Sequence, residues 1–210
     1  MGTQEDLIRP AGAETPPEHW RYTRHLEALA AAATRAAPAS APDAGHAGPP
    51  AGASAEAAGG AGADAVGGTG ALAVAVAVAV AVAEADAVAA VLRDPDPVMA
   101  ESAVVTHLDR RAAQLLDDAA FPGWADAMAV ALGDRAFPAH RLREWTLLRA
   151  VRRGEPWSTA ELTAASDWCQ RTAVRLLTSY EALTLLAASA RTRRVRNAAA
   201  QRLRRSTLPA

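Results

Sequence analysis

Seven arginines and no acidic residue lie within residues 191–210, whereas residues 1–190 hold all 23 acidic residues of the chain and 15 of its 22 arginines. A guanidinium group is permanently charged and forms paired hydrogen bonds with carboxylates and phosphates. A helix over about residues 192–205 would turn Val195, Ala199 and Leu203 inward and leave most arginines at the surface. These seven are the candidate binding residues: Arg191, Arg193, Arg194, Arg196, Arg202, Arg204 and Arg205.

Three interpretations of this basic segment stay open. It could be a solvated terminal helix that caps the fold and pairs with the acidic body of the protein. It could bind an acidic protein partner, or it could neutralise the phosphates of a nucleic acid. No aromatic residue is interleaved with the arginines, and no motif known to read bases occurs.

Other residues that could do chemistry have ordinary structural explanations. Gly68-Thr-Gly70-Ala-Leu-Ala73 has the spacing of a dinucleotide fingerprint, but a Gly-rich stretch precedes it where that site needs a strand. We therefore read it as the end of a linker. Cys169 lies beside Trp168 on the apolar stripe of an expected helix, which favours a buried and inert thiol.

The histidines and paired carboxylates do not form a recognisable site either. No two of the five histidines are four residues apart, so we expect partly exposed helix residues and no metal. Asp94 with Asp96, and Asp117 with Asp118, are predicted to cap helices or lie in turns. Five tryptophans are many for this chain, and one of them could line a groove: Trp20, Trp124, Trp145, Trp157 and Trp168. We predict no cofactor and no catalytic residue.

The elements that must position these residues are expected to be helices. A capping pattern and a double proline predict a first helix over about residues 16–35. From Asp94 onward, proline, glycine and capping residues repeatedly bound short segments with apolar residues three and four apart. One such segment, from Ser158 to about residue 179, is read as a single helix, and Thr178 is expected to cap the next one. The histidines expected to be partly exposed helix residues are His19, His25, His107 and His140, whereas His46 lies in the expected linker.

The alternating run of Ala and Val over residues 72–83 predicts a helix rather than a strand. Both faces of a strand would be apolar here, and Ala favours helices. We expect one helix over about residues 72–93, packed through its C-terminal half. The preceding stretch of Ala, Gly, Pro and Ser lacks large apolar residues and is predicted to be disordered. The expected organisation is an N-terminal segment over 1–36, a linker over 37–71, a domain of about seven helices over 72–206, and a tail over 207–210.

Residues 65–83 contain no charged side chain, which is near the length of a membrane span. Glycines interrupt the start of this stretch, and no aromatic or basic residues flank it. We expect no membrane insertion, with a membrane anchor as an alternative. No secretory signal is visible, and a single cysteine is consistent with a cytoplasmic protein.

Two segments related by a shift of 95 residues resemble HEAT-like α-solenoid repeats. Asp86–Leu92 aligns with Glu181–Ala187, and Ser102–Arg110 aligns with Asn197–Arg205. The stretch 195–203 is similar to the second helix of such a unit, whereas Ala100 and Glu101 depart from the Val-Arg pair of the other copy. The resemblance covers residues 84–115 and 180–206. It implies stacked helix pairs that bind partners through a helical surface, with no catalytic residue.

The sequence therefore predicts an all-α protein, an irregular HEAT-like bundle with a disordered Ala/Gly/Pro-rich insertion. The expected function is non-enzymatic: an interaction or scaffold protein that binds an acidic protein partner through a helical surface and the arginines. Two alternatives remain, a nucleic-acid-associated protein and a small enzyme with a pocket between helices.

Overall fold

The computed structural model describes residues 18–35 and 65–206, which are helical apart from turns and contain no strand. The prediction of an all-α fold is confirmed for these ranges. Nine helices are found in them: α1 (Glu18–Arg35), α2 (Ala65–Val91), α3 (Pro97–Leu115), α4 (Phe121–Leu132), α5 (Ala136–Arg153), α6 (Thr159–Ala164), α7 (Asp167–Leu176), α8 (Tyr180–Ser189) and α9 (Arg193–Ser206).

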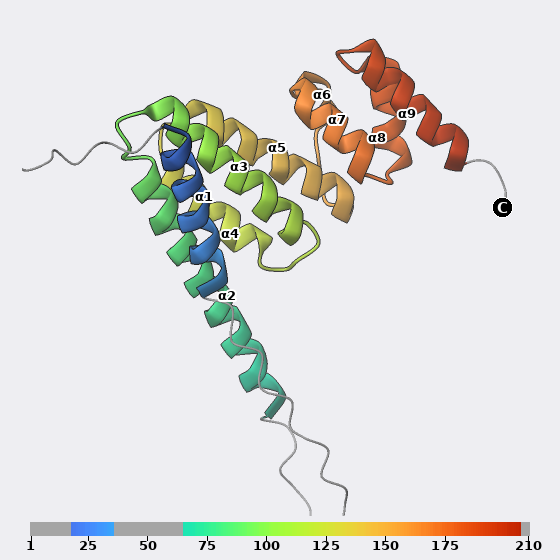
Figure 1. Cartoon of the computed structure of the whole chain (residues 1–210). Helices are drawn as coiled ribbons and strands as arrows, with labels where there is room; N and C mark the ends of the chain where they lie inside the picture. Colours follow the sequence, from blue (N-terminus) through green and yellow to red (C-terminus); the bar gives the residue numbers. More distant parts are fainter. Residues whose placement is uncertain (1–17, 36–64, 207–210) are drawn as a thin grey trace, which may run out of the picture.

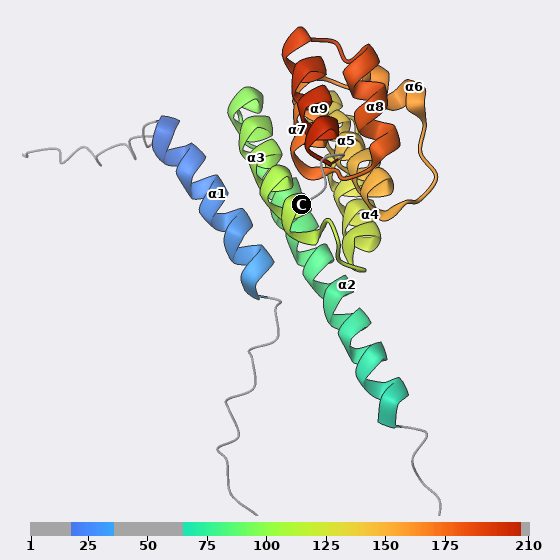
Figure 2. The ribbon, with the colours of Figure 1, turned by 90° about the vertical axis from the view of Figure 1, so that its right-hand side faces the viewer.

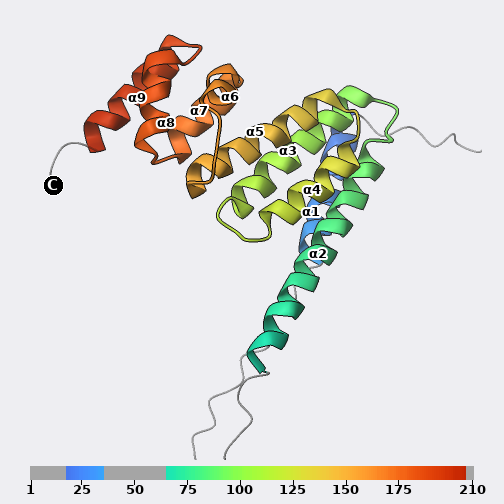
Figure 3. The same ribbon diagram turned by 180° about the vertical axis from the view of Figure 1, so that it is seen from behind.

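The helices form two groups that share one hydrophobic core. In the first group α1 packs on α2 and α3, and α4 lies beside α2. Helix α5 packs against both α3 and α4. In the second group α6 to α9 pack together, and α7 contacts α5 (Figures 1 and 3). Buried side chains run without a break from Leu29 in α1 to Ala199 in α9. The C-terminal helix is thus attached to the same core as the N-terminal one.

Helix α1 docks on the bundle through an apolar stripe and three polar contacts. Leu29 is fully buried. The Tyr22 hydroxyl lies 3.0 Å from the Thr106 hydroxyl in α3. Arg21 and His25 both reach Asp94, in the turn between α2 and α3, at 3.3 and 2.9 Å. The hydrogen bond from the Asp96 backbone N–H, together with His25 and Arg21, outweighs burial and lowers the pKa of Asp94. These contacts tie a segment that is distant in the sequence to the α2–α3 turn.

The capping residues set most helix boundaries as the sequence predicts. Asp96 accepts a hydrogen bond from the Met99 N–H at the start of α3, and Ser158 accepts one from the Glu161 N–H at the start of α6. Gly154 ends α5 in the left-handed region, at φ 69°, where glycine is strongly favoured.

The single helix expected from Ser158 to residue 179 is wrong, because the chain breaks into α6 and α7. The Ser166 side chain caps α7 by accepting from the Cys169 N–H, and the Ser166 N–H donates to Glu144 in α5. Both bonds require Ser166 to leave the helical conformation. Helix α8 is capped by Ser179 and not by Thr178. Residues 72–206 accordingly contain parts of eight helices, one more than expected.

Two side chains of α3 lie on other faces than predicted. From the sequence, we expect Val98 to belong to the buried apolar stripe of the helix after Asp96, but this residue is 76% exposed. It lies about 120° around the helix from the buried Val104, since each residue turns the helix by about 100°. His107 was expected to be partly exposed but is buried, because it follows Val104 by three residues and shares its inward face.

The Ala-Val run is helical, as predicted, but α2 begins earlier than expected. Residues 65–71, assigned to the linker by the sequence, belong to α2, and residues 36–64 lie outside the described ranges. The glycine motif at 68–73 falls inside this helix, so the turn that a dinucleotide site requires is absent there. The C-terminal half packs as expected, with Val88, Val91 and Leu92 buried. The N-terminal half extends beyond the other helices (Figures 1 and 2).

The two segments that resemble repeats have different helix neighbours. Helices α8 and α9 pack along each other, whereas α2 packs mainly on α4 and α1 and touches α3 only slightly. The repeat type therefore stays a prediction.

Candidate functional site

The candidate site is the surface of α9, and a buried polar residue of α7 fixes its position. Gln170 is fully buried. Its amide NH₂ donates to the Leu162 and Thr163 carbonyls of α6 at 3.1 and 2.9 Å, and its carbonyl oxygen accepts from the Arg191 N–H at 2.9 Å. One side chain thus joins the end of α6 to the turn that begins α9. Burying a side-chain amide is favourable only when its groups are paired in this way.

The inner face of α9 is short and apolar. Val195 and Ala199 are buried against the second helix group, and Leu203 is half-buried, in agreement with the inward face predicted from the sequence. The Thr192 hydroxyl accepts from the Val195 N–H at 3.4 Å and donates to Asp167 at 3.1 Å. The start of α9 is therefore fixed to α7.

Two of the seven candidate arginines have structural roles. Arg196 donates to the Ala190 carbonyl at 2.7 Å, at the end of α8. Arg202 donates to the carbonyls of Val174 and Arg175, in the last turn of α7. Carbonyls in the last turn of a helix lack intrahelical partners and carry partial negative charge. Arg202 therefore caps α7 and holds α9 against it.

Arginines at the two ends of α9 form its exposed basic face. Arg193 and Arg204 are 11 residues apart, which places them within about 20° around the helix and ~16 Å along it. Arg194 and Arg205 have the same relation on the neighbouring strip. All four side chains are exposed. Two exposed amide side chains, Asn197 and Gln201, lie between the two pairs.

One interpretation of the sequence expected the arginines to pair with the acidic body, and four of the seven do not. Arg191, Arg193, Arg194 and Arg205 have no carboxylate within ion-pair distance among residues 18–35 and 65–206. The arginines that do form ion pairs there belong to other segments, for example Arg149 with Glu155 at 2.8 Å. The positive charge of these four side chains is thus not compensated by an ion pair within the described part of the chain.

The stability of α9 does not explain why Arg193 and Arg194 lie at its N-terminal end. The N-terminus of a helix carries partial positive charge, so a cation there is unfavourable, typically by 0.3–1 kcal/mol. Arg193 and Arg194 occupy the first turn of α9. Arg204 and Arg205 are in the last turn, where the same dipole favours them. The helix dipole therefore gives no stability reason for the position of Arg193 and Arg194.

A further exposed arginine lies close to α9 in a segment that sequence reasoning did not connect with it. Arg175 is exposed near the end of α7, and its carbonyl accepts the hydrogen bond from Arg202. It therefore lies beside α9 although it precedes Arg202 by 27 residues. No sequence signal connects the two positions, because only the packing of α7 against α9 brings them together.

A second polar cluster, buried between α2, α3 and α4, is centred on Glu84. This carboxylate is fully buried. It accepts hydrogen bonds from Trp124 Nε1 at 2.9 Å and Arg111 Nε at 2.8 Å, and His107 Nε2 lies 3.3 Å from it. Burial alone would raise the pKa of Glu84, but the hydrogen bonds and positive charge around it outweigh burial and lower it. The ionised carboxylate thus holds three helices together.

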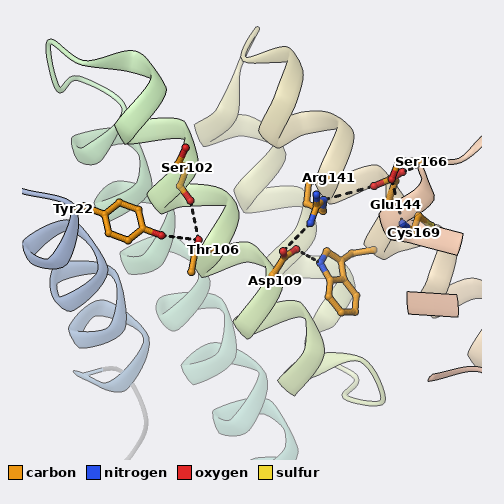
Figure 4. A network of polar contacts seen from close by, with 9 residues as sticks. Tyr22, Ser102, Thr106, Asp109, Arg141, Glu144, Ser166 and Cys169 are labelled. Atoms are coloured by element: carbon orange, nitrogen blue, oxygen red, sulfur yellow. Dashed lines mark hydrogen bonds and ion pairs between the residues drawn. The ribbon is translucent and has the colours of Figure 1, made fainter. Parts of the chain in front are cut away.

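A third polar network links α3, α5 and the α6–α7 turn (Figure 4). Arg141 donates to Asp109 at 2.7 Å, and its guanidinium carbon lies 3.6 Å from the centre of a Trp168 ring. Glu144 lies 3.6 Å from Arg141 and accepts from the Ser166 N–H at 2.8 Å. Each charged group in this network contacts an opposite charge. We assign it a structural role.

Cys169 is fully buried beneath this network, as the sequence predicts. Burial, reinforced by the nearby negative charge of Glu144, raises the pKa of its thiol to about 12. Since the thiolate is the reactive form, this cysteine is unsuited to nucleophilic chemistry near neutral pH.

A surface groove of about 490 Å³ lies between α5 and α6. Trp157 lines it, which fulfils the expectation that one tryptophan would line a groove, together with His140, Glu144 and Glu161. His140 Nε2 is 3.2 Å from Glu144, one helical turn away. No group of three or more His, Cys, Asp or Glu suited to a metal ion occurs within residues 18–35 and 65–206.

Comparisons with known proteins add no further information. No family model, curated protein or solved structure matches the chain.

Gly70–Val91 of α2 is long and apolar enough to cross a membrane, with a mean hydropathy of 2.1, and 22% of it is buried in the structure. Length and composition alone do not distinguish a span from a core helix of a soluble protein.

Proposed function

We propose that this protein is a non-enzymatic helical interaction protein that binds an acidic segment of a protein partner through α9. The observation that carries the proposal is the exposed row of arginines on α9, a helix that Gln170 and Arg202 fix in place. Three of these arginines, Arg193, Arg194 and Arg205, form no ion pair with an acidic residue of the described ranges. Exposed positive charge on a rigid element attracts an acidic partner and speeds its encounter.

The spacing of the arginines defines the partner that would fit. Arg193 and Arg194 lie ~16 Å along the helix from Arg204 and Arg205. A partner helix with acidic residues 11 positions apart would match both pairs at once. Between the pairs, Asn197 and Gln201 offer amide donors and acceptors. Exposed ion pairs contribute little singly, so binding requires both ends of the row.

The bundle would act as the scaffold of this surface. The resemblance to HEAT-like repeats supports the same class of function, since such proteins bind partners through helical surfaces. A nucleic acid is the competing ligand, because guanidinium groups also bind phosphates. An acidic protein is favoured because α9 carries no aromatic side chain on which a base could stack.

The test is a binding measurement with the full chain at physiological salt. A labelled helical peptide with glutamates 11 residues apart is titrated and followed by fluorescence anisotropy. The variant R193Q/R194Q/R204Q/R205Q removes four charges from α9. We expect it to weaken binding by roughly tenfold to a hundredfold, the sum of several small ion-pair contributions.

The matched control removes four exposed arginines elsewhere, in R24Q/R93Q/R110Q/R143Q. It changes the net charge equally and should reduce binding much less. Equal losses in both variants, or no binding by the wild type, would refute the proposal. Tighter binding of a DNA or RNA duplex than of the peptide at the same salt concentration would favour the nucleic-acid function instead.

A further inference from the structure

The N-terminal part of α2 exposes apolar residues that the other described helices leave largely uncovered. The free end of α2 extends beyond the other described helices (Figures 1 and 2). Residues 70–79 are here called the α2 overhang, and on one side Val76 and Ala77 are half-buried beside the start of α4. Leu72, Val74 and Val78 are 67%, 65% and 54% exposed, and Val82 continues the row at 51%. Contiguous exposed apolar surface of this kind marks an interaction site.

The exposed valines line a groove with α4. Val74, Val78 and Val82 are four residues apart and therefore share one side of α2. They face small residues at the start of α4 across a groove of about 440 Å³, with Ala120 and Gly123 on the opposite wall. A Cβ added at Gly123 would meet nothing within 4 Å, so this wall is open.

We propose that a second copy of this chain fills the groove, with the two overhangs packed antiparallel about Val78. In that register Val78 faces Val78, and Val74 of each copy faces Val82 of the other. A two-fold pairing of one surface with itself requires a surface that does not repel itself. Residues 70–83 carry no charged side chain. The alternating alanines also allow two helices to approach closely.

The dimensions of the overhang fit a reversible dimer. Residues 70–82 rise ~20 Å in a helix ~10 Å across, so covering half of that cylinder on both copies buries roughly 600 Å². Contact with the α4 wall of each groove adds to this area. The total approaches the ~1,000 Å² of a specific but weak interface. We therefore expect a dissociation constant in the micromolar range.

The chain connectivity argues against a membrane as the occupant. Helix α1 ends at Arg35 beside the bundle, whereas α2 begins at Ala65 at the far tip of the overhang. If the overhang crossed a bilayer, residues 36–64 would also have to cross it. That stretch contains four prolines and the ionisable residues Asp43, His46, Glu56 and Asp64, and no apolar run long enough to span.

The flanking residues agree with this conclusion. Helices that lie in a membrane surface usually combine an apolar face with a basic one, and spans carry aromatic or basic residues at their ends. The overhang is apolar on all sides, and its nearest charges toward the bundle are Glu84 and Asp86.

The test is the oligomeric state of the full chain, measured by sedimentation velocity over the micromolar range. We expect the wild type to dimerise as concentration rises, and V78E to remain monomeric because it sets two carboxylates face to face. V130E is the matched control, since Val130 is 84% exposed on α4 and lies outside the groove. It should dimerise as the wild type does.

Two further variants separate loss of pairing from loss of folding. G123L fills the groove at a position with open space and should prevent dimerisation while the helical circular dichroism is retained. V78R should be monomeric alone, and an equimolar mixture of V78R and V78E should restore a dimer, because opposite charges then face each other.

Three results would overturn the proposal. One is a wild type that stays monomeric throughout the concentration range. Another is a V78E or G123L protein that dimerises like the wild type. The third is flotation of the wild type, but not of V78E, with vesicles of phosphatidylcholine and phosphatidylglycerol in the absence of a dimer. That last result would assign the overhang to a membrane.

Discussion

Helices α2 and α9 both present a surface that the rest of the described chain leaves uncovered, and they do so with opposite chemistry. The α2 overhang is apolar and uncharged, and only its inner end is fixed, through the buried Glu84. Helix α9 is held along its length by Val195, Ala199 and Arg202, and it exposes arginines. The first surface suits a partner that removes it from water, and the second suits a partner that brings opposite charge.

This difference predicts different responses to salt. Burial of apolar surface does not weaken as ionic strength rises, whereas exposed ion pairs are screened beyond ~8 Å at physiological salt. Binding at α9 should therefore weaken with added salt and pairing at the overhang should not. The buried polar residues that hold the two helices in place, here called their anchors, also differ in charge. Glu84 holds α2 through a buried carboxylate, whereas Gln170 holds the start of α9 through a buried neutral amide.

The largest expected effect is the loss of stability on removal of the charged anchor, Glu84. Glu84→Ala should lower the free energy of unfolding by about 3–5 kcal/mol, because it leaves Arg111 and the Trp124 N–H without a buried acceptor. Urea denaturation at neutral pH measures this. Asp86→Ala, two residues further along α2 and exposed, is the control and should change stability by less than about 0.5 kcal/mol. A similar small change for Glu84→Ala would show that the cluster does not hold α2.

Removal of the neutral anchor, Gln170, should lower the free energy of unfolding by less than removal of Glu84. Gln170→Ala removes three hydrogen bonds between α6, α7 and the turn before α9, and we expect a loss of about 1–3 kcal/mol. The measurement is the same denaturation curve, with the exposed Gln201→Ala as control. If Gln170→Ala cost as much as Glu84→Ala, the proposed contrast between a charged and a neutral anchor would be wrong.

The charged anchor should also make stability depend on acid. The pKa of Glu84 lies below the ordinary value of 4.5, so this carboxylate stabilises the fold above that pH. The contribution is lost as the pH falls through the lowered pKa, at no more than about 1.4 kcal/mol per pH unit for one group. Glu84→Gln should give a shallower loss of stability on acidification below pH 4.5 than the wild type. Equal slopes would mean that other carboxylates, such as Asp94, dominate the acid response.

The smallest expected effect concerns the arginines at the start of α9. Arg194→Glu should raise stability by about 0.3–1 kcal/mol, because it replaces an unfavourable charge at a helix N-terminus with a favourable one. Arg205→Glu, at the other end, should lower stability by a similar amount. Both should weaken binding of the acidic peptide. Changes of the same sign in stability would contradict the argument that Arg193 and Arg194 are placed for binding.

Local signals in the sequence predicted much of the fold because their physics is local. Capping by Asp96 and Ser158, the left-handed end at Gly154, and the helical Ala-Val run each depend on residues within a few positions. The break at Ser166 was missed, although Ser166 is a good cap, because the bond that favours it comes from Glu144, 22 residues away. The site was predicted in part: the seven arginines were named, but their division into capping and exposed groups was not.

The sequence by itself determined that the chain would be helical and that α9 would turn Val195 and Ala199 inward. It also determined that positive charge would gather within the last 20 residues of the chain. These follow from periodicity and composition. Only the tertiary structure decided that Glu84 would be buried against Arg111 and Trp124, and that Arg202 would cap α7. It also decided that the other described helices would leave the N-terminal part of α2 exposed. Those outcomes depend on which helices lie side by side, and helices distant in the sequence become neighbours only when the core forms.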